Sequence, residues 1–153
     1  MKIAIIGYPY SGQVELAQYL EKKFFCPTLY LDHIFPKSEA SDEIKKQMLE
    51  NYLKENISWV IEGSYDNILF EKRMEEADKI VIMRFNRFAC LFKYLRAHRK
   101  ANQEINEEEI KELFINSRKK EHRKLYNKVM RQYSEKVVLM NRRTHVLLFR
   151  DII

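Results

Sequence analysis

Cysteine, glycine and long apolar runs are all scarce in this chain of 153 residues. Its two cysteines, Cys26 and Cys90, lie far apart and show no CxxC spacing, which excludes a disulfide framework and a cysteine zinc site. No run approaches the ~20 apolar residues of a membrane span, and Ile3–Ile6 is too short for the apolar part of a secretory signal. These absences predict a cytoplasmic protein without membrane contact.

The three glycines and the charges are unevenly distributed. Glycine occurs only at Gly7, Gly12 and Gly63, so each position is informative. The net charge is −4 over residues 1–83, +8 over 84–132 and +2 over 133–153, for a total of +6. The excess of positive charge therefore belongs to one segment, 84–132.

Short apolar, β-branched runs alternate with helical patterns along the chain. The predicted helix over 41–55 has Ser41 as its N-cap and turns Ile44, Met48 and Tyr52 to the core. Alternation of this kind predicts an α/β protein with a parallel sheet covered by helices on both faces, and with functional groups at the carboxyl ends of the strands. The five predicted strands are Lys2–Gly7, Thr28–Asp32, Trp59–Gly63, Lys79–Phe85 and Lys136–Met140.

The long segment 86–133, between the last two strands, is mostly helical. Two apolar stripes at helical spacing are expected to face the core. No linker or internal repeat interrupts the chain, so residues 1–153 are expected to form a single domain. The first stripe comprises Phe88, Leu91, Phe92 and Leu95, and the second comprises Ile110, Leu113 and Phe114.

The first predicted strand runs directly into Gly7-Tyr8-Pro9-Tyr10-Ser11-Gly12-Gln13-Val14. Both glycines stand as in the phosphate-binding motif G-x-x-x-x-G-K-[ST], in which backbone N–H groups and the lysine hold phosphates and the Ser/Thr hydroxyl holds magnesium. The residues predicted to contact a nucleotide here are Gly7, Tyr10, Ser11, Gly12, Gln13 and Val14. The alternative is that this segment is only a tight strand-to-helix turn.

Four positions of this loop depart from the motif. Gln13 brings no charge where the lysine would stand, and Val14 offers no oxygen to magnesium. Pro9 lacks an N–H group, and Tyr10 is bulky where a small residue that tolerates positive φ is usual. The sequence therefore predicts phosphate binding with magnesium in doubt, and no histidine or cysteine spacing predicts a metal site.

Four further segments carry a family resemblance. In order and spacing, LYLDHIF (29–35), WVIEGSY (59–65), EEADKIVI (75–82) and NRFACLFKYLR (86–96) resemble motifs of the DNA topology modulation proteins, which are adenylate-kinase-like P-loop proteins. The resemblance spans nearly the whole chain. It implies a three-layer α/β/α fold of the P-loop NTPase and nucleoside-monophosphate-kinase type, with strand order 2-3-1-4-5 and a helical lid within 86–133.

The resemblance can be followed residue by residue. Gly7, Ser11 and Gly12 match the phosphate loop of the family, Asp32 matches the acid after its second strand, and Glu62-Gly63 stand at its Asp-Gly pair. Tyr65, Arg87 and Cys90 match as well, whereas Tyr10, Gln13, Val14 and Arg84 depart from the pattern. Asp32, Glu62 and Arg87 are the candidate catalytic residues that follow from these positions.

Arginines of the helical segment are candidates for holding phosphate groups, as lid arginines do in such kinases. The candidates are Arg87, Arg96, Arg99, Arg118 and Arg123, of which Arg118 and Arg123 are assigned to binding the nucleotide. Arg84 either supplies the charge missing at Gln13 or pairs with Asp32 or Glu62. The competing interpretation of these cations is a solvated basic face.

The expected function is that of a P-loop protein which binds ATP, another nucleotide or a small phosphorylated compound, with weak or lost phosphotransferase activity. Two alternatives stay open. The basic segment 84–132 is a candidate nucleic-acid surface, and an arginine in place of the loop lysine would make the chain an active kinase.

Overall fold

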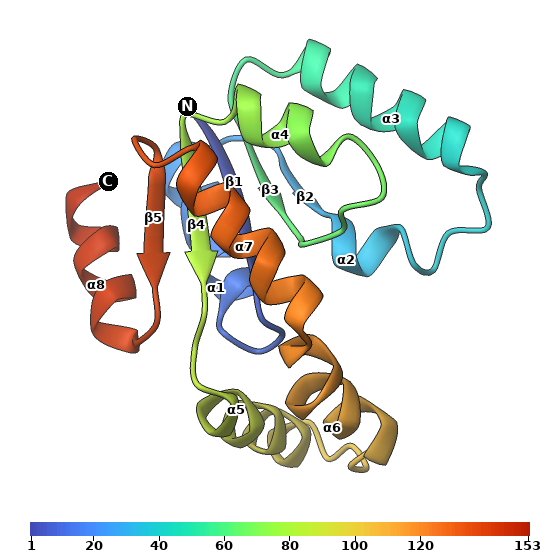
Figure 1. Ribbon diagram of the computed structural model, residues 1–153, viewed down its shortest axis with the longest axis vertical. Helices are drawn as coiled ribbons and strands as arrows, with labels where there is room; N and C mark the ends of the chain where they lie inside the picture. The colour runs from blue at the N-terminus through green and yellow to red at the C-terminus, as the bar shows by residue number, and fades with distance from the viewer.

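The computed structural model describes all 153 residues and contains one five-stranded sheet. All neighbouring strands are parallel, in the order β2-β3-β1-β4-β5 (Figure 1). The predicted sheet and its strand order are therefore confirmed. The strands are β1 (Lys2–Gly7), β2 (Thr28–Tyr30), β3 (Trp59–Glu62), β4 (Lys79–Met83) and β5 (Val137–Met140).

Helices cover both faces of the sheet. On one face α3 (Asp42–Glu55), α4 (Phe70–Glu76) and α7 (Lys120–Gln132) enclose a core that includes Ile61 and Tyr126. On the other face α1 (Gln13–Phe24) and α8 (Arg143–Ile152) pack over Val60 and Val81. Consecutive residues of one strand, such as Val60 and Ile61, enter opposite cores, because successive side chains of a strand point to opposite faces.

The remaining helices lie beyond the carboxyl ends of the strands. α5 (Arg87–Lys100) and α6 (Glu107–Phe114) project below the sheet, the 3₁₀ helix η1 (Asn116–Arg118) follows them, and the one-turn helix α2 (Leu31–Ile34) stands after β2 (Figure 1). The segment predicted to be helical is helical, but its last part, α7, belongs to the layer that covers the sheet. No helix is both long and apolar enough to cross a membrane.

The buried face of α3 differs from the predicted one. Ser41 does cap the helix, since its Oγ accepts a hydrogen bond from the backbone N–H of Ile44. However, Ile44 and Met48 are 54% and 56% exposed, and the buried row is Lys45, Leu49 and Leu53. The two rows lie side by side on the helix, and only the placement of the helix on the sheet decides which row is buried.

The apolar stripe predicted for α5 was also wrong at its phenylalanines. Phe88 and Phe92 are exposed, whereas Cys90, Tyr94 and His98 are buried. The reason is that α5 packs against α6 beyond the sheet, where the Tyr94 hydroxyl donates to Glu109 Oε2 at 2.8 Å. A buried hydroxyl with a partner is as acceptable there as an aliphatic side chain.

Several boundaries and two helices also differ from the sequence-based expectation. β2 ends at Tyr30, so Asp32 lies in the first turn of α2 rather than at a strand end. β4 ends at Met83, which leaves Arg84 and Phe85 in the connection to α5. Helices α4 and α8 had no predicted counterpart.

Candidate functional site

The loop between β1 and α1 is anchored to the sheet at Gly7. A Cβ at this position would lie 2.1 Å from the carbonyl oxygen of Met83 on β4. The Gly7 N–H donates to Ser64 Oγ at 3.0 Å, and its carbonyl accepts from the Tyr126 hydroxyl at 2.9 Å. The start of the loop is therefore fixed by the segment after β3 and by α7.

Removing the Tyr126 hydroxyl should weaken this anchor. Tyr126→Phe loses the buried hydrogen bond to the Gly7 carbonyl and the partly buried contact with Ser64 Oγ at 3.1 Å. We expect a loss of about 1–2 kcal/mol in the free energy of unfolding, measured in urea. Tyr133→Phe is the control, because the Tyr133 hydroxyl is bonded only at the exposed Gln132 side chain. Equal losses in the two variants would contradict this account of the anchor.

The side chain at the lysine position of the motif is turned back on the loop. Gln13 is buried, and its Nε2 donates to the Tyr8 carbonyl at 2.6 Å. Tyr10 takes the left-handed conformation with φ 61°, and its ring meets Tyr94 edge-on at 5.2 Å. Ser11 Oγ accepts from the Phe85 N–H at 3.3 Å. The side chains of Gln13 and Ser11 are thus engaged within the protein, and the loop brings no cation of its own.

Asp32 holds the segment that follows β3. Its two carboxylate oxygens accept hydrogen bonds from the backbone N–H groups of Ser64 and Tyr65, both at 2.9 Å. Arg73, which is fully buried, donates to the carbonyl of Gly63 at 3.2 Å and to that of Tyr65. The candidate acid Asp32 is therefore engaged in positioning the backbone beside the loop.

Glu62 is an unusual carboxyl group. It is only 4% exposed, and its Oε2 has no hydrogen-bond partner. Burial, and to a smaller extent the charges of Asp32 and Glu15, raise the pKa of Glu62 to about 8. The group is therefore mostly protonated at neutral pH.

These residues do not fit the magnesium ion of the standard motif. The Val14 side chain has no ligand atom, each oxygen of Asp32 already accepts a hydrogen bond from a backbone N–H group, and Glu62 is only 4% exposed. Magnesium prefers charged or carbonyl oxygens in an octahedral arrangement, which this set lacks. No group of three His, Cys, Asp or Glu side chains elsewhere could hold a metal ion.

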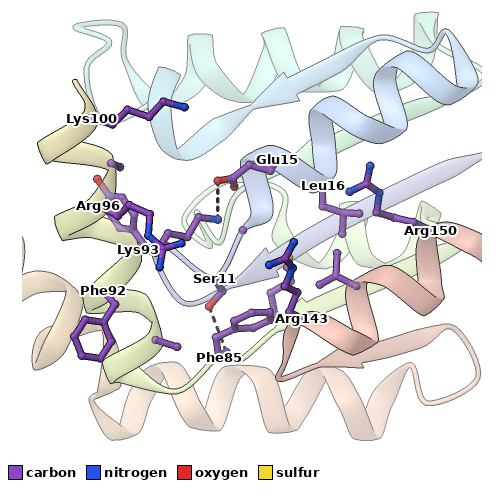
Figure 2. A pocket seen from close by; sticks show the side chains of 16 residues that line it. Ser11, Glu15, Leu16, Phe85, Phe92, Lys93, Arg96, Lys100, Arg143 and Arg150 are labelled. Carbon is purple, nitrogen blue, oxygen red and sulfur yellow. Dashed lines mark hydrogen bonds and ion pairs between the residues drawn. The ribbon is translucent and has the colours of Figure 1, made fainter.

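A cleft of about 610 Å³ opens beside the loop, between α5 and α8 (Figure 2). The loop enters its wall through Tyr10, Ser11 and Gly12. Its volume is in the range of pockets that hold small molecules. The apolar wall includes Leu16, Met83, Phe85, Phe92 and Val146, and the cations are Lys93, Arg96 and Lys100 of α5 with Arg143 and Arg150 of α8.

Comparison with solved structures identifies the fold. The chain is similar to deoxyadenosine kinase from M. mycoides with bound dATP, at 14% identity and TM-score 0.58, over 99% of this chain and 98% of that one. It is also similar to shikimate kinase from Acinetobacter baumannii in complex with shikimate, at 14% identity and TM-score 0.57, over 99% and 89% of the two chains. This chain has the P-loop kinase fold. No protein-family model and no curated protein matches its sequence.

In this P-loop kinase fold, a lysine outside the motif lies next to the loop. Lys93 of α5 forms an ion pair with Glu15 of α1, with Nζ 2.6 Å from Oε1. Figure 2 shows this pair beside the loop that carries Ser11. A Cβ added at Gly12 would lie 3.2 Å from the same Nζ. Lys93 thus brings a positive charge to the loop that Gln13 does not supply.

Among the cleft cations the sequence interpretation named only Arg96, and it missed Lys93, Lys100, Arg143 and Arg150. Lys93, Arg96 and Lys100 recur at the spacing of one helix face, a signal that was present in the sequence. Arg143 and Arg150 lie on α8, a helix that was not predicted.

Of the five candidate arginines, Arg96 lines the cleft and Arg99 lies outside it, while the other three gather elsewhere. Arg87, Arg118 and Arg123 line a second cavity together with Arg84. Arg84 pairs with neither Asp32 nor Glu62, since its Nη1 donates to Asn127 Oδ1 at 3.1 Å. The structure therefore separates the predicted site into the loop, the two acids near β3 and a group of arginines.

Proposed function

We propose that this protein binds a nucleotide, ATP or another, in the cleft between α1, α5 and α8, and that its phosphoryl transfer is weak or lost. The cleft supports this function because it combines an apolar wall with cations at the side of the phosphate loop. Apolar and aromatic side chains suit a base, and guanidinium and ammonium groups suit phosphates. The neighbouring kinase that holds dATP has the same fold.

The phosphates of the nucleotide would lie against Ser11, Gly12 and the N-terminus of α1. Backbone N–H groups at a helix N-terminus favour anions. Lys93 is the cation next to this position, and its ion pair with Glu15 would be exchanged for a contact with phosphate. Lys93 is therefore the proposed substitute for the motif lysine.

Weak or absent transfer follows from the same residues. Phosphoryl transfer depends on cations that neutralise charge developing on the phosphoryl oxygens. At the motif position Gln13 is neutral and already bonded to Tyr8, and Val14, Asp32 and Glu62 do not fit magnesium. In this proposal the cations of α5 and α8 hold the nucleotide, while the lysine and the metal ion that the motif supplies for transfer are missing.

Calorimetric titration of ATP and ADP tests the proposal. We expect micromolar binding whose dissociation constant changes less than about threefold when magnesium is added, because no residue holds the ion. Arg96→Ala, which removes a cleft cation, should weaken binding about tenfold, the loss expected for one charge-assisted bond.

Arg99→Ala is the matched control, since Arg99 is an exposed arginine of the same helix outside the cleft. Absence of binding at millimolar nucleotide would contradict the proposal. ADP formation from ATP and an acceptor, at rates typical of kinases, would favour the active-kinase alternative instead.

Nucleic-acid binding through segment 84–132 is the second candidate. Lys119, Lys120, Arg123 and Lys124 are exposed and form no ion pair, which favours an anionic partner for this part of α7. For such a surface we expect an affinity for DNA that falls steeply as the salt concentration rises. Membership of the DNA topology modulation proteins stays a prediction that depends on the sequence motifs alone.

A further inference from the structure

The outward side of α8 is apolar and exposed. Leu148 and Ile152, which lie one helical turn apart, are 62% and 81% exposed, and Leu147 beside them is 46% exposed. Figure 1 shows α8 as the outermost element beside β5. We call the surface formed by Leu147, Leu148 and Ile152 the α8 face. Single exposed apolar side chains are ordinary on proteins, but a contiguous group of them marks a contact surface.

A groove of about 400 Å³ lies beside the α8 face. Leu148 and Ile152 thus belong both to the protruding surface and to the wall of the groove. Protruding side chains next to a groove of the same chemistry can insert into that groove on a second copy, as a contact with twofold symmetry requires. The apolar lining of the groove consists of Val138 and Leu139 of β5 with Leu148, Phe149, Ile152 and Ile153.

The exposed charges of α8 oppose its own helix dipole. Arg142 and Arg143 stand at the positive N-terminal end, where the first turn contains no acid. Asp151 stands in the last turn, at the negative end, and each of these charges is unfavourable there in an isolated helix. Arg150 of the same turn lines the cleft beside the loop and stacks 3.8 Å from the ring centre of Tyr19. The exposed part of α8 is therefore positive at its start and negative at its end.

These charges have no ion-pair partner within the chain. None of its ion pairs involves Arg142, Arg143 or Asp151, and the Nε of Arg142 donates to His145 Nε2 at 3.0 Å. An antiparallel helix of the same sequence would bring its aspartate to the arginine end and its arginines to the aspartate end. It would also oppose the two helix dipoles favourably. Charge complementarity therefore favours a second copy of this chain as the partner.

We propose that two copies of this chain associate through their α8 faces, with the two helices antiparallel across a twofold axis. Leu148 and Ile152 of each copy enter the groove of the other, and Asp151 of each copy pairs with Arg142 of the other. The contact is small, so the dimer is weak and reversible, with a dissociation constant on the order of 10 µM. Different residues of α8 line the cleft beside the loop, so this inference does not depend on nucleotide binding.

Sedimentation velocity at protein concentrations from about 1 to about 200 µM tests the association. We expect the natural protein to shift from monomer to dimer across this range. The double variant Leu148→Ser, Ile152→Ser should raise the dissociation constant at least about tenfold, because it removes the apolar contact. The matched control is Ile44→Ser, Met48→Ser, a pair of exposed apolar residues one turn apart on α3, which should dimerise as the natural protein does. A monomer at every concentration, or an equal loss in the control, would overturn the inference.

Reversal of charge tests the antiparallel arrangement. Arg142→Glu and Asp151→Lys change exposed side chains, so both variants should fold. Each variant alone places like charges at both ends of the helix pair and should dimerise about fivefold more weakly. An equimolar mixture of the two variants should regain the natural affinity within about twofold, because every end then meets an opposite charge. A mixture that associates no more tightly than the separate variants would contradict the antiparallel dimer.

Discussion

Replacing Glu62 by glutamine should remove a loss of stability that the natural protein undergoes as the pH rises from about 5 to about 9. The ordinary pKa of this carboxyl group is 4.5, and burial raises the pKa of Glu62 to about 8 in the folded protein. Between these values the folded state binds more protons than the unfolded state, so the free energy of unfolding falls as the pH rises. The full effect is on the order of 4 kcal/mol.

Urea unfolding of both proteins across this pH range measures the effect. Other titrating groups contribute equally to both, so the difference between the two proteins isolates Glu62. The free energy of unfolding of Glu62→Gln should be close to that of the natural protein at pH 5 and higher by several kcal/mol at pH 9. Glu121→Gln is the control, at an exposed position without an ion pair. Its free energy of unfolding should change with pH as that of the natural protein does. Parallel curves for Glu62→Gln and the natural protein would mean that Glu62 ionises normally.

Gly7→Ala should be the most damaging small substitution in the loop. The added methyl carbon would lie 2.1 Å from the carbonyl oxygen of Met83, which is backbone and cannot move without disturbing β4. Gly7 and Met83 are direct partners in the parallel β1–β4 pair, and the same carbonyl accepts from the Tyr8 N–H at 2.9 Å. We expect a loss of about 3 kcal/mol or more in the free energy of unfolding.

Gly12→Ala provides the comparison. Its φ of 99° also disfavours a side chain, but the nearest atom to the new methyl group is the mobile end of Lys93 at 3.2 Å. The cost should be about 1–2 kcal/mol, the price of a left-handed conformation alone. Both variants can be measured by urea unfolding. Similar losses would indicate that conformation, and not the clash with β4, explains the glycine at position 7.

Around the loop between β1 and α1, positive charge comes from helices outside the loop. In the standard motif the lysine and the metal belong to the loop and its first helical turn. Here Gln13 is neutral, while Lys93 and Arg96 of α5 and Arg150 of α8 face the cleft from outside the motif. We infer that recognition of phosphate depends on these helices, and the alanine variants of α5 test that inference directly.

The sheet could be predicted because its signals are local. Apolar runs such as Ile3–Ile6 and Val60–Ile61 indicate strands that are buried on both faces. Gly7 and Gly12 mark the turn between a strand and a helix, and Ser41 marks a helix start. Each of these patterns lies within a few neighbouring residues, so chain propensity and hydrophobic spacing suffice to interpret it. The strand order followed from the family resemblance.

The site was decided by contacts between segments that are distant in the sequence. Glu62 becomes an unpartnered buried acid only because the sheet and its covering layers exclude water there. Lys93 reaches Gly12 across 81 positions of sequence, and Arg84 and Arg118 line one cavity from separate elements. The sequence by itself determined the strands, the loop and the scarcity of loop cations. Only the tertiary structure decided which charges surround the loop, because helix packing beyond the sheet sets those distances.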